Sequence, residues 1–541
     1  MKTHRILFQP MGQRGIFPEG TSILEAARRL NIGLLNVCGG NGTCGHCKVQ
    51  VVSGAVSDRT QEEEQFLSPE EIESGFRLAC RTIPLEDTTL QVPAESLSAP
   101  QRTQVECRIA YPSGIGMAAF NPSAPMGLAM DLGTTKIALF LVDLETGETL
   151  ASQGWMNPQI KYGEDVISRI ALSDHDQRMQ KTVVNELNSW IQKITKDIGR
   201  HPEDIQQAVA VGNTAMHHLF LNLPVSQLAK APYVPAIKSE VNIKAREVGL
   251  KLAENAILHL PPLIGGFIGS DHVAAILASD HQQGTGTRLI LDIGTNTEIS
   301  LVGPGFISSA SCASGPAFEG AHIRHGMRAA EGAMEHVRIN NGQVDIQTIG
   351  NIPPTGICGS GILDAVSQLL ENGIIDKTGV MKDPGRTRIR NNEREFVLFS
   401  GDGANGTRDI TLTQKDVREV QLAKAAIQTG IKALLQNHHF PLKELSQVLV
   451  AGAFGSYIDL ESAKAIGLVP MLPSSRFVQM GNAAGAGARM ILVSARERKK
   501  SLEIAAKATF LELAVKPDFR KLFMESLVLE PYASSVGVNT P

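Results

Sequence analysis

Four of the seven cysteines lie in the first eighty residues, with the types and spacing of a redox centre. Cys38, Cys44 and Cys47 stand in the glycine-rich stretch CGGNGTCGHC, and Cys80 follows at a distance. Cysteine thiolates bind iron, and glycines let the backbone wrap closely and direct N–H groups at the sulfurs. The C-x5-C-x2-C spacing with a distant fourth cysteine therefore predicts a [2Fe–2S] cluster.

Zinc is the alternative occupant of four cysteines. A four-cysteine zinc ribbon commonly has two C-x2-C pairs, whereas this sequence has one such pair and an isolated Cys80 after a helical stretch at 68–73. This asymmetry favours the cluster. The first gap is one residue longer than in plant-type ferredoxins, and the spacing resembles that of adrenodoxin-like proteins.

Other residues near the cluster motif have simpler interpretations. His46 stands between two of the expected ligands, and we expect it to lie at the surface and not to bind metal. Arg77 and Arg81 flank Cys80, and we expect them to be solvated charges, with a docking surface as the alternative. The other three cysteines are isolated and are expected to be ordinary buried thiols: Cys107, Cys312 and Cys358.

A D-x-G-T pattern occurs twice, in LAMDLGTTKIAL at 128–139 and in LILDIGTNTEIS at 289–300. Glycines let backbone amides approach phosphate oxygens, threonine hydroxyls add donors, and an aspartate holds a hydrated Mg²⁺ or positions an attacking water. We assign the catalytic role to Asp131 and Asp292. The nucleotide-binding residues expected in the two hairpins are Gly133, Thr134, Thr135, Gly294, Thr295 and Asn296.

Two further glycine motifs accompany the hairpins. In VLVAGAFGS, at 448–456, small residues after an apolar strand let an adenosine lie against the backbone. In GICGSG, at 356–361, glycines open a helix whose N-terminus can bind an anion. No P-loop pattern and no strand-linked G-x-G-x-x-G is present, which disfavours P-loop and dinucleotide folds. The residues assigned to nucleotide binding here are Gly359, Gly361, Gly452, Ala453, Phe454 and Gly455.

The elements that position these residues form two similar halves. Three antiparallel strands are expected at 127–132, 136–143 and 149–155, and three more at 288–293, 297–302 and 306–310. We expect helices at 178–197, 362–371 and 415–435, and a strand at 263–270 before a helix from Asp271. The loop SCASGPAFEG, at 311–320 with Glu319, either changes shape with nucleotide or is a tight turn.

Some polar side chains on these helices have two interpretations. Gln421, Lys424 and Gln428 are candidates for nucleotide contact, with a solvated polar face as the alternative. His217 and His218 are expected to be packed, with a position facing the cleft as the alternative. The glycine- and alanine-rich stretch 481–488 predicts a helix that packs tightly against a sheet.

The N-terminal residues predict a small β-grasp fold, with strands near 3–9, 15–18, 48–52 and 88–92 and a helix at 23–30. A proline-rich connector containing a strand at 104–110 follows. We divide the chain into a ferredoxin-like domain at 1–94, a linker at 95–125, the first part of an ATPase core at 126–206 and a C-terminal ATPase domain at 207–541.

Composition excludes some classes of function. A net charge of −4 over 541 residues gives no reason to expect binding to nucleic acid or to an anionic membrane. No run approaches the ~20 apolar residues of a membrane helix, and the N-terminus lacks a secretory apolar core. We therefore expect a cytoplasmic protein.

The two D-x-G-T hairpins and the motif VLVAGAFGS resemble the phosphate-1, phosphate-2 and adenosine motifs of the actin, sugar-kinase and heat-shock-chaperone ATPase superfamily. This resemblance implies a duplicated, ribonuclease-H-like core of two lobes that binds ATP and Mg²⁺. With the cluster domain, nearly the whole chain resembles the reductive activators of corrinoid proteins. The matching stretches are the four cysteines, DLGTT at 131–135, DIGTNTE at 292–298, SGPAFEG at 314–320, GICGSG at 356–361 and AGAFG at 451–455.

The resemblance implies a multidomain protein of α/β and α+β class with an ATP-hydrolysing, reductive activity. Such a protein takes an electron from reduced ferredoxin, flavodoxin or a reductase. It converts an inactive Co(II) corrinoid, carried by a partner protein of a methyltransferase system, to active Co(I). The family also implies anaerobic metabolism and a homodimer.

Three other classes remain as alternatives. A sugar or acid kinase would use the same hairpins but would not need a cluster domain. An activator of a radical dehydratase couples this ATPase fold to an electron, but typically through a [4Fe–4S] cluster between two subunits. A non-enzymatic electron-transfer adaptor would have a degenerate core, whereas both aspartates and all the glycine motifs are intact here.

Overall fold

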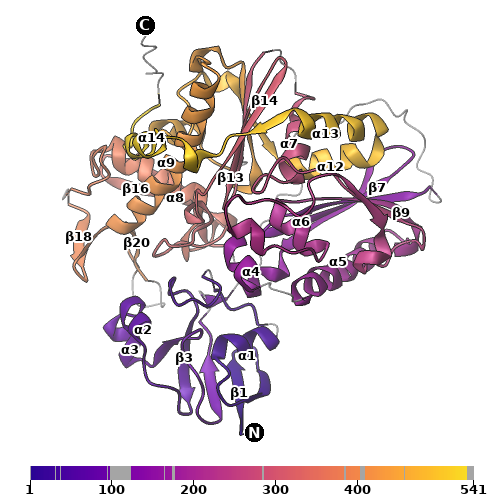
Figure 1. The fold of residues 1–541 in the computed structure, drawn as a ribbon. Helices are drawn as coiled ribbons and strands as arrows, with labels where there is room; N and C mark the ends of the chain where they lie inside the picture. The colour runs from indigo at the N-terminus through magenta and orange to yellow at the C-terminus, as the bar shows by residue number, and fades with distance from the viewer. Residues whose placement is uncertain are drawn as a thin grey trace.

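The computed structural model shows a small N-terminal domain beneath a larger body of two lobes (Figure 1). The structure describes residues 2–30, 32–36, 38–93, 96–97, 124–163, 165–172, 177–282, 286–382, 385–401, 408–455 and 457–532. Most of the predicted linker, its strand at 104–110 and Cys107 lie outside these residues. Among the described residues, no helix is both long enough and apolar enough to cross a membrane.

The N-terminal domain is a five-stranded mixed sheet packed against a helix, as expected of a β-grasp fold. The strand order is β2-β1-β5-β3-β4, with β1 and β5 parallel. Ser22 caps the first helix by accepting from the N–H of Glu25. The elements are β1 (Thr3–Gln9), β2 (Gln13–Pro18), α1 (Ile23–Arg29), β3 (Lys48–Ser53), α2 (Gln61–Phe66), α3 (Pro69–Glu73), β4 (Phe76–Leu78) and β5 (Thr88–Gln91).

Arg77 is buried. It is therefore neither a solvated charge nor part of a docking surface, and both interpretations from the sequence are wrong. Its Nε and Nη2 donate to the two carboxylate oxygens of Glu63 at 2.8 and 2.9 Å. Glu63 is fully buried and also caps α2 by accepting from the N–H of Thr60. The sequence did not indicate α2, and this pair explains why the short helix is held against β4. Arg81 is partly exposed, and it bonds to the carbonyl of Asn41 and pairs with Glu62.

The first lobe is built on a six-stranded sheet with the order β10-β11-β9-β6-β7-β8. The predicted meander corresponds to β6, β7 and β8, and β9 to β11 extend the sheet beyond β6, so strands on both sides of residue 206 belong to one sheet. The elements are β6 (Met126–Leu132), β7 (Lys136–Asp143), β8 (Thr149–Met156), α4 (Val166–Leu172), α5 (Arg178–Asp197), β9 (Ile205–Val211), α6 (Thr214–Phe220), β10 (Val241–Lys244), β11 (Ile257–Leu260) and α7 (Ser270–Ser279).

One predicted strand of this lobe is wrong. The apolar stretch 263–268 is a loop, and the strand is β11, which ends at Leu260. The glycines explain the difference, because a Cβ at Gly266 would lie 1.9 Å from the carbonyl oxygen of Tyr233, so this stretch turns closely beside another segment. The helix after it begins at Ser270, as expected to within one residue.

The second lobe repeats the plan with a sheet of order β22-β21-β12-β13-β14-β23. The predicted meander corresponds to β12, β13 and β14, and β21 pairs parallel to β12. The elements that carry the site are β12 (Arg288–Ile293), β13 (Thr297–Gly303), β14 (Phe306–Cys312), β17 (Gly356–Ile357), α8 (Gly359–Glu371), α9 (Gln414–Asn437), β21 (Gln447–Ala451), α10 (Gly452–Gly455), α11 (Leu460–Ala465), β22 (Phe477–Gly481) and α12 (Ala483–Val493).

Two small sheets and a C-terminal segment complete the second lobe. The sheets have the orders β16-β15-β17 and β18-β19-β20. The remaining elements are β15 (Ala333–Asn340), β16 (Gln343–Thr348), β18 (Thr387–Arg390), β19 (Glu393–Phe399), β20 (Ile410–Thr413), α13 (Ala495–Lys507), β23 (Ala508–Phe510) and α14 (Phe519–Ser526).

The polar residues singled out on α9 hold the C-terminal segment and do not line the nucleotide cleft. Gln421 Nε2 donates to the carbonyl of Leu527 at 2.8 Å, and Lys424 Nζ donates to that of Val528 at 2.6 Å. Lys424 is fully buried. Both expectations for them, nucleotide contact and a solvated face, are wrong, because segment 527–530 covers this face of α9.

The two lobes share a core around α7 and α12. One apolar cluster joins residues of β7, β9, β12 and β21 to both helices. The helices approach so closely that a Cβ at Gly487 would lie 2.1 Å from the carbonyl oxygen of Ala274. The predicted small-residue helix is therefore confirmed, and its tightest neighbour is another helix.

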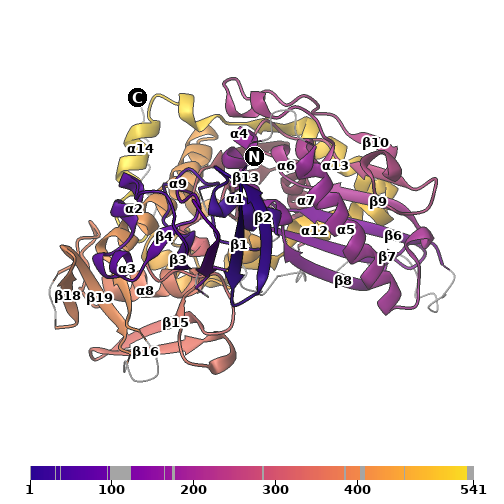
Figure 2. The ribbon, with the colours of Figure 1, turned by 90° about the horizontal axis from the view of Figure 1, so that it is seen from below.

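The N-terminal domain lies across both lobes (Figure 2). A Cβ at Gly39 would be 3.1 Å from Ser168 Cβ, on α4 of the first lobe. On the other side, Glu70 of α3 pairs with Arg390 of β18 in the second lobe. The loop that carries the cysteines thus faces the body of the protein.

Candidate active site

The four cysteines come together as two pairs. A sulfur–sulfur hydrogen bond joins Cys38 to Cys44 and lowers the pKa of Cys38 to about 4, and a second one joins Cys47 to Cys80. Within the described ranges, no three His, Cys, Asp or Glu side chains are arranged around a single metal ion. Two pairs of thiols suit two irons better than one zinc ion, which supports the [2Fe–2S] interpretation.

Glycines shape the cysteine loop because side chains would not fit there. Gly45 has φ of +70°, and a Cβ on it would lie 2.9 Å from Phe66 Cβ. At Gly42, with φ of +75°, a Cβ would meet the guanidinium of Arg81 at 2.3 Å. The left-handed backbone and the close neighbours both require glycine.

His46 is half-buried against the second lobe, which differs from the surface position expected for it. Burial lowers the pKa of His46 to about 4, and nearby His322 and Arg328 add to this effect. Arg328 also lines the cleft between the lobes. The charge of a residue that lines the cleft therefore acts on His46.

The two predicted hairpins face each other across a cavity of about 260 Å³ between the lobes. Most of the predicted nucleotide-site residues line it. They are Asp131, Gly133, Thr134, Thr135, Asp292, Gly294, Thr295, Asn296, Gly359, Gly452 and Phe454.

Two residues assigned to this site from the sequence, Gly361 and Gly455, are not among those that line the cavity, and a third, Ala453, has a side chain outside the described structure. Gly361 lies inside α8, where a Cβ would meet the carbonyl oxygen of Met334 at 2.2 Å. Gly455 packs on Val450, whose Cγ1 would be 2.7 Å from an added Cβ. Both glycines serve close packing.

Glu319 connects the two hairpins. Its carboxylate accepts from Thr135 Oγ1 of the first hairpin at 3.2 Å and from Thr295 Oγ1 of the second at 2.5 Å. The loop 311–320 therefore reaches into the cleft. The structure shows one arrangement of this loop, so its change of shape with nucleotide stays a prediction.

Four carboxylates line the cleft together: Asp131, Asp271, Asp292 and Glu298. The surrounding protein removes most of their solvent, which raises the pKa of Asp131 to about 7, that of Asp271 to about 8 and that of Asp292 to about 6. Mutual repulsion adds to the shifts of Asp131 and Asp271. Such an acidic cluster suits a hydrated divalent cation held with nucleotide phosphates.

Two asparagines, one at a helix start of each lobe, both support the first hairpin. Asn213 accepts from the N–H of Met216 to cap α6, and its Nδ2 donates to Thr134 Oγ1 at 2.7 Å. Asn482 accepts from the N–H of Gly485 to cap α12, and its Nδ2 donates to Asp131 Oδ2 at 2.9 Å. Each asparagine fixes a helix start and a hairpin together.

Sequence reasoning missed these asparagines as well as Asp271, Glu298 and Lys136. A signal for the asparagines exists, since each follows a glycine at the end of an apolar strand, in VAVGNT and VQMGNA. Lys136, at the start of β7, lines the cavity, and burial lowers its pKa to about 8. Nothing local distinguishes Asp271 or Glu298, because only the tertiary fold brings them beside Asp292.

Phe454 of the adenosine motif and Phe318 of the loop 311–320 form an aromatic wall. Phe454 stacks on Phe318, with ring centroids 4.7 Å apart and planes at 16°. Both rings line the cavity. His217 and His218 lie outside this wall and are buried, as expected, with His218 Nδ1 2.7 Å from the carbonyl oxygen of Thr214.

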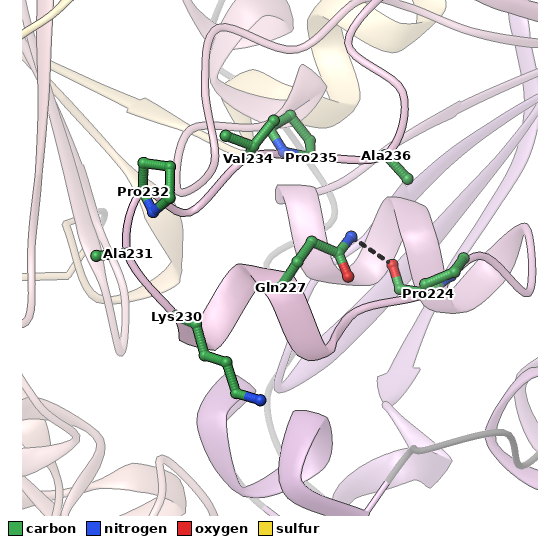
Figure 3. Close-up of a pocket in the computed structure, with 8 residues that line it drawn as sticks. All are labelled: Pro224, Gln227, Lys230, Ala231, Pro232, Val234, Pro235 and Ala236. Carbon is green, nitrogen blue, oxygen red and sulfur yellow. Dashed lines mark hydrogen bonds between the residues drawn. The ribbon is translucent and has the colours of Figure 1, made fainter.

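A second hollow of about 420 Å³ lies at residues 224–236 of the first lobe (Figure 3). Prolines and alanines make up most of its wall, and Lys230 is the only charged residue among those that line it. Its Gln227 donates to the carbonyl of Pro224 at 2.8 Å. This wall offers no pair of groups for acid–base or phosphate chemistry, so we place the reaction in the cleft.

Three family models match consecutive parts of the chain. A 2Fe-2S iron-sulfur cluster binding domain matches residues 9–85, the RACo middle region matches 126–284, and the C-terminal domain of RACo, the ASKHA domain, matches 286–536. These matches confirm the predicted [2Fe–2S] ferredoxin domain and the ATP-binding core of the actin and sugar-kinase type.

Individual proteins resemble the chain over most of its length. The corrinoid activation enzyme RamQ of Eubacterium limosum is 37% identical, over 74% of this chain and 69% of that protein. The [Co(II) methylated amine-specific corrinoid protein] reductase of Methanosarcina barkeri is 27% identical, over 74% and 76%. A solved reductive activator for corrinoid,iron-sulfur protein covers 98% of both chains with a TM-score of 0.68 and 29% identity. With its two pairs of cysteines and its duplicated phosphate hairpins, this chain belongs to the family of reductive activators of corrinoid proteins.

Proposed function

We propose that this protein uses ATP to reduce an inactive Co(II) corrinoid, bound to a partner protein of a methyltransferase system, to active Co(I). The observation that carries this proposal is a cysteine loop suited to a [2Fe–2S] cluster that packs, at Gly39, against Ser168 of the same body that holds the nucleotide cleft. A kinase would not need this cluster domain. When bound, a [2Fe–2S] cluster supplies one electron at a time.

The role of ATP follows from the energy of the electron transfer. If the reduction potential of the cobalt lies ~240 mV below that of the electron donor, the equilibrium constant for the transfer is about four decades unfavourable, or roughly 5.5 kcal/mol. Nucleotide can offset this only by binding two states of the activator–corrinoid complex with different affinity. A cleft between two lobes is suited to this, because closing it changes both lobes together.

The residues of the cleft have separate tasks in this proposal. The hairpin amides at Gly133 and Gly294 and the hydroxyls beside them bind phosphate oxygens. Asp131 and Asp292 hold a hydrated Mg²⁺ or position the attacking water. Gly452 and Phe454 receive the adenosine, and the residues of the cysteine pairs, Cys38, Cys44, Cys47 and Cys80, hold the cluster.

The setting of this activity is also part of the proposal. We infer a cytoplasmic homodimer that receives its electron from reduced ferredoxin, flavodoxin or a reductase. The family resemblance supports the homodimer, and the ferredoxin domain supports an electron donor of this kind. Light scattering in solution tests the dimer, which should have twice the mass of the chain.

The central test follows the spectrum of Co(I) in a mixture of oxidised corrinoid protein, reductant and this protein. We expect Co(I) to form rapidly with ATP and slowly without it. Asp131→Ala and Asp292→Ala should lower ATP hydrolysis by at least ~100-fold, as losses of charge-stabilising groups commonly do, and should lower Co(I) formation with it. A rate of Co(I) formation that does not depend on ATP would refute the coupling.

A further inference from the structure

The carboxylate of Glu319 stands where the hairpin hydroxyls would otherwise bind phosphate. Thr135 and Thr295 were assigned to the nucleotide from their place in the two D-x-G-T motifs, and both donate to Glu319 here. Glu319 lines the cavity. One anionic side chain thus joins both phosphate hairpins, one from each lobe.

A phosphate group would compete with this carboxylate. A hydroxyl has one proton to donate, so Thr135 and Thr295 cannot donate to Glu319 and to a phosphate oxygen at the same time. A carboxylate and a terminal phosphate are both negative, and two like charges a few ångströms apart repel when little water separates them. Lys136, which feels the charge of Glu319, can pair with either anion.

The backbone links Glu319 to Arg328. Glu319 ends a short 3-10 helix, Ala317–Glu319, and Gly320 follows with φ of +83°. The segment then folds back, so that a Cβ at Gly320 would lie 2.5 Å from the carbonyl oxygen of Met327. Arg328 comes next and lines the same cavity as Glu319. A shift of Glu319 is therefore felt along the segment that ends at Arg328.

We propose that Glu319 is a positioning residue that joins the two phosphate hairpins through Thr135 and Thr295 and is displaced by the γ-phosphate of ATP. This inference rests on the proposed binding of ATP in the cleft and names the residue that distinguishes ATP from ADP. ADP lacks the γ-phosphate, so it leaves the bridge from Glu319 to Thr135 and Thr295 in place. Displacement of Glu319 is the event by which ATP shifts the segment from Gly320 to Arg328.

Binding of two nucleotides to the full-length, cluster-loaded protein tests the proposal. Glu319→Gln removes the charge and keeps the shape of the side chain. We expect the β,γ-imido analogue of ATP to bind about tenfold more tightly to this variant, which equals ~1.4 kcal/mol, and ADP to bind as before. Glu331→Gln is the matched control, because Glu331 lies on the same segment and is exposed.

The alternative outcomes are distinct. A structural role for Glu319 would change the affinities for the ATP analogue and for ADP together, and this result, or no change in either, would overturn the proposal. A catalytic base at this position would lower kcat and leave the affinity for the analogue unchanged, which would also overturn it. If the wild-type protein bound neither nucleotide, the proposed function itself would fail.

Hydrogen exchange of the wild-type protein gives a second test that does not depend on a variant. We expect the amides of residues 317–328 to change their protection when the ATP analogue binds and to keep it when ADP binds. Equal protection with both nucleotides would overturn the proposal even if Glu319→Gln failed to fold.

Discussion

The carboxylates of the cleft are the residues whose chemistry depends most on the fold. Asp131 and Asp292 were identified from a local pattern, because an aspartate before a glycine turn is visible in the sequence. Asp271 and Glu298 were not identified. Asp271, at the start of α7, and Glu298, on β13, come beside Asp292 only in the folded protein. Sequence patterns find residues that act within one turn, and they miss residues that act across the cleft.

The raised pKa values predict how stability changes with pH. In the nucleotide-free protein, Asp131, Asp271 and Asp292 have pKa values of about 7, 8 and 6, all above the ordinary value. Their contribution to stability is therefore fully present below pH ~4 and is lost as pH rises through the folded-state values, by on the order of a few kcal/mol in total. We expect the melting temperature to fall between pH 6 and pH 8.

Magnesium with ATP should reverse this trend, because a divalent cation binds the deprotonated carboxylates. Melting curves at pH 6, 7 and 8, with and without Mg²⁺ and ATP, measure both effects. Asp271→Asn should flatten the pH dependence of the nucleotide-free protein. An equally steep dependence in this variant would assign it to other groups.

At the scale of elements, the duplicated meanders were predictable and the short connecting elements were not. Strands β6 to β8 and β12 to β14 alternate with turn residues, so their patterns are strong. Helix α2 is only six residues long, and what holds it is a tertiary contact, the pair of Arg77 with Glu63. The loop at 263–268 has the composition of a strand but is shaped by close backbone contacts.

Replacing Arg77 tests whether this pair holds the small domain together. Arg77→Leu should destabilise the N-terminal domain by about 3–5 kcal/mol, because it leaves the buried carboxylate of Glu63 without its charged partner. Thermal unfolding followed through the visible absorption of the cluster measures the loss. Arg5→Leu is the control, since Arg5 pairs with Asp87 at the surface and both side chains are more than 60% exposed, where such pairs contribute about 0–1 kcal/mol. Equal effects of the two changes would contradict this assignment.

At the scale of the whole molecule, the order of domains followed from the sequence but their placement did not. The cysteine motif and the glycine motifs each define a domain. That the cysteine loop rests on α4 and near Arg328 depends on surfaces whose complementarity has no pattern in the sequence. Gly39, for example, has a local role in the loop and also allows the approach of Ser168.

Ser168→Trp should separate the cluster domain from the lobes. Ser168 Cβ lies so close to Gly39 that a larger side chain meets the loop. We expect a larger radius of gyration by small-angle X-ray scattering, with the melting temperature of the ATPase core unchanged. Gln192→Trp places the same side chain at an exposed position of α5 and should leave the radius unchanged. An unchanged radius for Ser168→Trp would show that the domain is not held by this contact.

The cysteine loop that faces the lobes has a kinetic consequence for electron exchange. Because loop and lobes belong to one chain, the lobes meet the loop at an effective concentration that is set by the length and stiffness of the linker and not by the amount of protein in solution. An outside electron donor or acceptor that approaches through this loop competes with the protein's own body. At high partner concentration the rate of exchange then reaches a ceiling set by how often the domain lifts away, and adding more partner does not raise it.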